Sequence, residues 1–215
     1  MEEKTSTPDS LQDLHDIRKM MNRSSRFISL SGLSGIAAGV CALAGAAIAV
    51  SRFNYYKKNN PGMIRTETVD QLTYELLIIA VVVLIAAFVS SFLFTWRRAK
   101  NQQLPLWDYT SKRLLWNLCI PLVAGGLFIT GMLYYGEWRF VAPACLVFYG
   151  LALINASKYT LTDIRYLGYC EIVLGLINMF FIGYGLIFWA IGFGCLHILY
   201  GAIMWWKYER KPEVL

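Results

Sequence analysis

Charge is scarce in this sequence. Of its 215 residues, 16% are Asp, Glu, Lys or Arg and 57% are hydrophobic. Soluble domains usually carry about 25% charged residues and roughly 45–50% apolar ones. The shortage of charge excludes an ordinary water-soluble domain and predicts that lipid surrounds much of the chain.

Catalytic and metal-binding signatures are also absent from the sequence. It contains no G-x-S-x-G or H-E-x-x-H motif, and its two histidines, His15 and His197, are too few for a multi-histidine metal site. The five cysteines form no C-x-x-C pair and lie in apolar segments, where we interpret them as small buried hydrophobic residues. We therefore predict no metal and no cofactor, and we favour a non-catalytic protein.

Long apolar runs are what the sequence has in abundance. A helix that crosses a bilayer needs about 20 mostly apolar residues. Six segments qualify: 27–50, 76–96, 114–135, 140–156, 164–182 and 186–206. The runs are continuous and lack the alternation of barrel strands, so their backbone groups satisfy one another as helices. The sequence predicts an all-α integral membrane protein, with a bundle of six transmembrane helices over residues 27–206.

The net charge of +6 is unevenly distributed among the connections between these runs. Fifteen of the 20 Lys and Arg residues fall on the side that carries both termini. The positive-inside bias then predicts cytoplasmic termini, and short loops with this bias suit a multi-pass protein of a bacterial inner (cytoplasmic) membrane. No basic face with interleaved aromatic residues is present, so we predict the lipid bilayer, and not nucleic acid, as partner.

The polar N-terminal arm, residues 1–26, is predicted to contain a short amphipathic cytoplasmic helix. Ser10 and Asp13 form a capping box at its start, and apolar residues recur at helical spacing at Leu11, Leu14, Ile17 and Met21. This helix would lie on the membrane surface or dock a soluble partner. The apolar run that follows is too long for a signal-peptide core and should remain as an anchor. Residues 207–215 are the predicted cytoplasmic tail.

The first two runs differ in composition. Gly35 and Gly39 form a G-x-x-x-G step, which lets helix backbones approach closely. We expect this helix to pack centrally within the chain, with self-association through the same two glycines as the alternative. Residues 76–87 are entirely Leu, Ile, Val and Ala, which favours a lipid-facing helix. Residues 51–71, between the two runs, form the predicted external loop.

A repeat is one hypothesis for the second half of the chain. At a single offset, Cys119 aligns with Cys170, Trp138 with Trp189, and Tyr149-Gly150 with Tyr200-Gly201. Parallel repeats occur in transporters. Chance matching is the alternative, because most intervening positions disagree.

Three polar residues within the last two runs are the main candidates for a functional site. Glu171 and Asn178 share one helical face with two glycines, and His197 lies on the following helix. A charged side chain in the bilayer costs roughly 2.5–3.5 kcal/mol on insertion scales, so such residues usually face the bundle interior and find a partner. We predict a Glu171–His197 pair, direct or through water, with Asn178 deeper. The hydroxyls of Tyr149 and Tyr200 lie at depths that allow them to join this binding site.

These features leave three classes of function. The first is a regulatory, sensory or assembly component that acts through a membrane or cytoplasmic partner, and the absence of motifs favours it. The second is a small-solute or proton-coupled transporter that uses the Glu171/His197 pair. The third is an intramembrane enzyme in which Glu171 orients His197 as a general base. A structural hydrogen bond between two helices is the simplest interpretation of the same pair.

Overall fold

The computed structural model describes residues 30–59, 66–103 and 107–210. Every regular element in these ranges is helical: α2 (Gly32–Asn59), α3 (Thr66–Asn101), α4 (Tyr109–Tyr134), α5 (Val141–Ala156), α6 (Asp163–Asn178), α7 (Gly185–Trp189), the π-helix η4 (Ala190–Leu196), α8 (His197–Tyr208), and the short turns η1 (Trp138–Phe140), η2 (Ser157–Tyr159) and η3 (Ile182–Tyr184). Elements α7, η4 and α8 follow one another without a break and form one long helix. The prediction of an all-α protein is confirmed for these ranges, and the predicted N-terminal amphipathic helix lies outside them.

Five segments are long and apolar enough to cross a membrane: Gly32–Asn59, Gln71–Asn101, Tyr109–Tyr134, Trp138–Tyr159 and Ile182–Tyr208. The remaining predicted run, 164–182, gives α6, which has only 16 residues. At about 1.5 Å per residue α6 is about 24 Å long, less than the roughly 30 Å of a hydrocarbon core. It is short because, after Asn178, the backbone N–H groups of Phe180 and Phe181 bond three residues back and the chain turns.

The connection between the first two helices is shorter than predicted. The expected loop at 51–71 is wrong, because α2 continues to Asn59 and α3 already begins at Thr66. Polar contacts hold these extended helix ends together. Tyr56 Oη donates to Glu75 Oε1 at 2.9 Å, and Arg52 Nε lies 3.9 Å from Glu75 Oε2.

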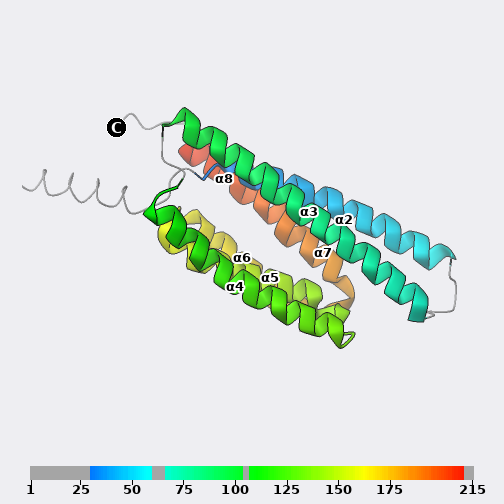
Figure 1. Ribbon diagram of the computed structural model, residues 1–215. Coiled ribbons are helices and arrows are strands. Elements are labelled where there is room, and N and C mark those ends of the chain that lie inside the picture. Colours follow the sequence, from blue (N-terminus) through cyan, green and yellow to red (C-terminus); the bar gives the residue numbers. More distant parts are fainter. Residues whose placement is uncertain (1–29, 60–65, 104–106, 211–215) are drawn as a thin grey trace, which may run out of the picture.

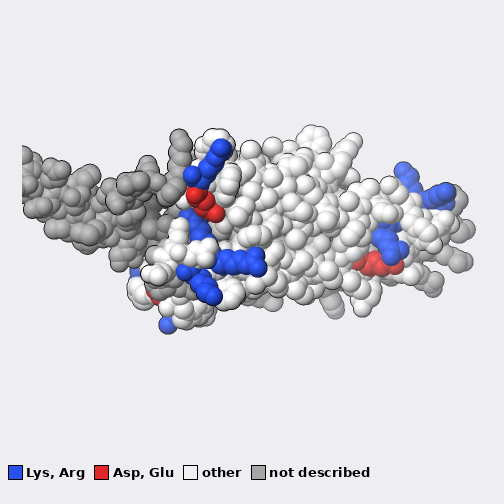
Figure 2. Space-filling model, turned by 90° about the horizontal axis from the view of Figure 1, so that it is seen from above, with Lys and Arg blue, Asp and Glu red and all other residues white. Residues whose placement is uncertain are grey.

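The helices form two groups that lie side by side (Figure 1). One group contains α2, α3 and the α7–α8 helix, and the other contains α4, α5 and α6. The start of α2 and the end of α8 lie together beside Arg98, since Glu209 accepts from Gly32 N and pairs with Arg98; we name this the Arg98 end. The opposite end, where α2 finishes after Arg52, is the Arg52 end. Figure 2 shows Lys, Arg, Asp and Glu gathered at these two ends, with an uncharged zone between them. Such a zone is expected of a protein whose middle lies in lipid.

Glycines make the closest contacts inside each group. A methyl group at Gly39 would lie 2.7 Å from the Gly194 carbonyl oxygen, and Gly35 meets the same long helix one turn away. In the other group, a methyl group on either Gly150 or Gly168 would lie within 2.8 Å of the carbonyl oxygen of the other. The G-x-x-x-G step of the sequence therefore packs against another helix of the same chain.

Helix α3 has the least buried surface of the five candidate spans. None of the residues in its most apolar window is buried inside the protein. Leu84 and Phe88, for example, are 69% and 68% exposed. A long apolar surface of this kind matches the expectation of a lipid-facing helix.

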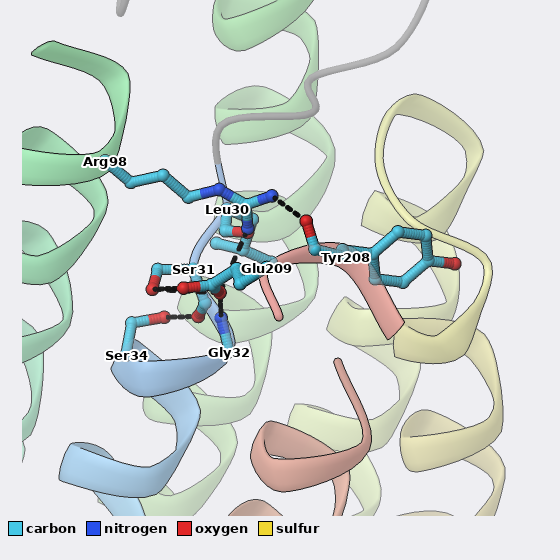
Figure 3. A network of polar contacts seen from close by, with 7 residues as sticks. All are labelled: Leu30, Ser31, Gly32, Ser34, Arg98, Tyr208 and Glu209. Carbon is cyan, nitrogen blue, oxygen red and sulfur yellow. Dashed lines mark hydrogen bonds and ion pairs between the residues drawn. The ribbon is translucent and has the colours of Figure 1, made fainter. Parts of the chain in front are cut away.

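A buried ion pair closes the Arg98 end of the first group (Figure 3). Arg98 Nη1 lies 3.1 Å from Glu209 Oε1 and also donates to the Leu30 carbonyl oxygen. Glu209 accepts hydrogen bonds from Ser31 Oγ at 3.2 Å and from the Gly32 backbone N–H at 2.6 Å. Its carboxylate therefore caps the N-terminus of α2, where the helix dipole favours negative charge. We name these five residues the Arg98–Glu209 clasp.

Candidate interior polar site

Three of the five predicted site residues come together between the two helix groups. Glu171 lies on α6, Tyr149 on α5, and His197 at the start of α8. Glu171 is fully buried and His197 is 7% exposed. We name these three side chains the Glu171 cluster.

The face of α6 that carries Glu171 is buried along its length. Gly168, Glu171, Gly175 and Asn178 recur at spacings of three, four and three residues, and all four are buried. A methyl group at Gly175 would lie 2.8 Å from Val147 Cγ2 of α5. The glycines therefore let α6 lie close to α5 and turn its polar residues inward.

His197 contacts a different polar group with each ring nitrogen. Tyr149 Oη lies 2.8 Å from Nε2, and the Gly192 carbonyl oxygen lies 3.0 Å from Nδ1. Glu171 Oε1 is also near Nδ1, at 3.4 Å. The rings of Tyr149 and Phe193 lie 5.3 Å and 5.9 Å from the imidazole, centroid to centroid. Packing and hydrogen bonds together fix the orientation of the imidazole ring.

These contacts define where His197 carries its hydrogen. A carbonyl oxygen can only accept, so the bond to Gly192 requires a hydrogen on Nδ1. In the neutral ring, Nε2 then accepts from the Tyr149 hydroxyl; in the protonated ring, Nε2 donates to the same oxygen. The cluster accommodates both protonation states of His197 without moving a heavy atom. The Glu171 carboxylate would balance the charge of the protonated ring.

Gly192, in the π-helix before His197, leaves room for the Glu171 carboxylate because it has no side chain. A methyl group at Gly192 would lie only 2.6 Å from Glu171 Oε2. π-Helical turns are rare and are often found at functional sites. Here the π-helical segment Ala190–Leu196 leads directly into His197. It contains Gly192, whose carbonyl oxygen contacts His197 Nδ1.

Glu171 and Asn178 have no hydrogen-bond partners among the described residues. Both carboxylate oxygens of Glu171 and both amide atoms of Asn178 are buried and unbonded. A buried polar group left without a hydrogen bond costs about 1–3 kcal/mol, and most such groups in proteins are bonded. Asn178 lies about 10 Å beyond Glu171 along α6, by the helical rise, so it does not join the cluster.

Tyr200 contacts a neighbour of the cluster and not the cluster itself. Its Oη lies 3.5 Å from Cys170 Sγ. Nearer the Arg98 end, Asp163 of α6 accepts a hydrogen bond from Tyr208 Oη at 2.6 Å. The sequence prediction omitted Asp163, although its spacing from Glu171 places both on one helical face. Polar contacts between α6 and α8 therefore follow the seam between the two helix groups.

Within residues 30–59, 66–103 and 107–210, no three His, Cys, Asp or Glu side chains are grouped so that they could hold a metal ion. Comparison with protein-family models, with curated protein sequences and with solved structures found no match for this chain.

Proposed function

We propose that this chain is a multi-pass protein of a bacterial inner membrane, with six crossings and cytoplasmic termini. Five helices have the required length and hydropathy, and α6 is the sixth, short crossing. An even number of crossings agrees with the start of α2 and the end of α8 lying together, where Gly32 N donates to Glu209. Among the described residues, the Arg98 end is richer in basic side chains than the Arg52 end, which supports its assignment to the cytoplasm. The basic residues on its side are Arg97, Arg98, Lys100, Lys112, Arg113, Lys158, Arg165, Lys207 and Arg210.

We propose further that the protein is a non-catalytic regulatory or sensory component that responds to protonation and acts through a membrane or cytoplasmic partner. One observation carries this proposal: the fully buried Glu171 lies 3.4 Å from His197 Nδ1, while Tyr149 bonds the other ring nitrogen. Ionisable residues inside a membrane usually mark proton relays or ligand sites. The cluster is built to take up and release one proton.

The position of the cluster supports a route from protonation to a change of shape. Tyr149 and Glu171 belong to one helix group and His197 belongs to the other, so a proton gained or lost alters the attraction across the seam. The same seam continues to the Asp163–Tyr208 hydrogen bond at the Arg98 end. A ligand, here a proton, shifts an equilibrium only through its different affinity for the two states. The proposed partner would sense that shift at the Arg98 end.

Infrared spectroscopy of the full chain in lipid nanodiscs tests the proton site. A carboxylate band that shifts as the pH falls and His197 gains its proton is expected in the wild type and should be missing in Glu171→Gln. The exposed Glu137 provides the control, because Glu137→Gln removes a carboxyl group far from the cluster. A titration that is unchanged by Glu171→Gln would contradict the proposal.

Affinity capture in mild detergent tests the partner. A cytoplasmic or membrane protein retained by the wild type at one pH and released at another is expected. In Glu171→Gln its retention should no longer depend on pH. A partner whose retention depends on pH equally in both proteins would show that the Glu171 cluster does not control partner binding.

A proton-coupled or small-solute transporter is the second candidate. The observation in its favour is that the Glu171 cluster lies between two helix groups, as transporter sites lie between structural halves. In sealed proteoliposomes this candidate predicts proton flux that stops in Glu171→Gln and persists in Glu137→Gln. Equal flux in wild-type and Glu171→Gln vesicles would exclude a transport role for the cluster.

A further inference from the structure

A shallow apolar groove runs along the outside of α4 and α5, towards the Arg98 end. Its volume is about 380 Å³, and its lining consists of Pro121, Phe148, Leu151, Ile154, Asn155 and Lys158. The α5 residues recur at spacings of three and four, so they share one face of that helix. The groove is therefore apolar along most of its length and ends at a cation.

Two contacts between α4 and α5 fix the shape of this groove. Pro121 has no N–H to bond the Asn117 carbonyl oxygen one turn earlier. Asn155 Nδ2 donates to that oxygen instead, at 2.9 Å. Farther along, Phe148 lies where a methyl group at Gly125 would come within 2.6 Å of its Cγ. These contacts between α4 and α5 thus fix the two sides of the groove relative to each other.

The charge and the length of the groove match one lipid molecule. The Lys158 side chain is exposed, and its Nζ lies 3.3 Å from Asn155 Oδ1. From Phe148 to Lys158 the helix rises about 15 Å, which is about half of a roughly 30 Å hydrocarbon core. One acyl chain of a single leaflet spans that depth. A second hollow of about 270 Å³, at the start of α4, also combines apolar residues with a lysine: Trp107, Lys112, Leu115, Trp116 and Cys119.

We propose that the groove binds one anionic phospholipid from the leaflet at the Arg98 end. An acyl chain lies along Phe148, Leu151 and Ile154, and the phosphate accepts a hydrogen bond from Lys158. An anionic headgroup is preferred over a zwitterionic one, because a choline group brings a cation of its own next to the lysine. This site lies on the outer surface and is independent of the proton site.

Native mass spectrometry of the full chain, released from detergent after mixing with phosphatidylglycerol or phosphatidylcholine, tests the proposal. The wild type should retain one phosphatidylglycerol and little phosphatidylcholine. Lys158→Ala should weaken retention roughly five-fold, the usual worth of one basic residue near anionic lipid. Leu151→Trp should weaken it without any change of charge, since Leu151 is 43% exposed and its replacement fills the groove. Lys58→Ala, at the Arg52 end, is the matched control and should behave as wild type.

Three outcomes would overturn the proposal. The first is equal retention of phosphatidylglycerol by wild type, Lys158→Ala and Leu151→Trp. The second is displacement of the lipid by inorganic phosphate, which would make a free anion the ligand. The third is a dimer that dissociates in Leu151→Trp, which would make a second copy of the chain the occupant of the groove.

Discussion

Glu209 and Glu171 are both largely removed from water, but their surroundings differ. In the Arg98–Glu209 clasp, Glu209 pairs with Arg98 at 3.1 Å and accepts the Gly32 backbone N–H at 2.6 Å. Glu171 has no hydrogen bond on either oxygen, and its Oε1 lies 3.4 Å from His197 Nδ1. A fully bonded carboxylate holds helices together. A carboxylate left unbonded beside an imidazole is instead suited to exchanging a proton, so the two sites are expected to respond differently to substitution.

The largest effect is expected from breaking the clasp. Arg98→Ala leaves Glu209 without its cation, and removal of one partner of a buried pair typically costs about 3–5 kcal/mol. The Glu209 side chain is 15% exposed, so we expect the lower end of this range. Denaturation in detergent measures the loss. The double variant Arg98→Met/Glu209→Gln should recover part of the lost stability. A loss below about 1 kcal/mol in Arg98→Ala would show that the clasp does not stabilise the fold.

A smaller loss is expected when the Glu171 site is crowded. Gly192→Ala places a methyl group 2.6 Å from Glu171 Oε2, and overpacking of this kind usually costs about 1–3 kcal/mol. It should also alter the infrared band of the Glu171 carboxyl group. Gly126→Ala is the matched control, because nothing lies within 4 Å of a methyl group at that position. Equal stability and an unchanged band in both variants would contradict the assigned contact.

The coupling between Glu171 and His197 is expected to be smaller still. Polar pairs between membrane helices contribute about 0.6 kcal/mol on average and up to about 1.7 kcal/mol. Glu171→Gln, His197→Leu and the double variant form a cycle whose unfolding free energies in detergent measure this coupling. We expect a non-additive result within that range. Purely additive losses would mean that the two side chains do not interact.

The smallest effect is expected at Asp108, which is only partly buried. Its carboxylate caps α4 and accepts hydrogen bonds from Ser111 N at 2.7 Å and Ser111 Oγ at 2.6 Å. Burial is the largest single influence and raises the pKa of Asp108, but the hydrogen bonds together lower the pKa below its ordinary value.

The pKa of Asp108 is lower in the folded protein than in the unfolded chain. The cap therefore contributes its full stabilisation at pH values above the unfolded-state pKa, and this stabilisation is lost as the pH falls through the folded-state pKa. The difference in melting temperature between wild type and Asp108→Ala should therefore shrink below about pH 4. A difference that stays constant through that range would show that the charge of Asp108 does not contribute.

The sequence predicted much of this arrangement because two of its signals are local. Apolar runs identify helices, and three-four spacing assigns Gly168, Glu171, Gly175 and Asn178 to one face. The tight turn after α6 makes the next helix its antiparallel neighbour, which brings Glu171 towards His197. These inferences need no knowledge of how distant segments meet.

The features that the sequence did not predict depend on distant contacts or on small rotations about a helix axis. Arg98 and Glu209 are 111 residues apart, and no local pattern pairs them before α2, α3 and α8 meet. Tyr200 reaches Cys170 and not the adjacent Glu171, a difference of one helical position. The end of α6 depends on its backbone turn, which an uninterrupted apolar run does not reveal.

Nitrogen NMR of His197 in nanodiscs tests the central claim most directly. The chain has only two histidines, so His15→Gln leaves one imidazole signal. We predict a neutral ring with its hydrogen on Nδ1 at high pH and a doubly protonated ring at lower pH, the latter less populated in Glu171→Gln. A ring that carries its hydrogen on Nε2 at every pH, and that does not respond to Glu171→Gln, would contradict the account.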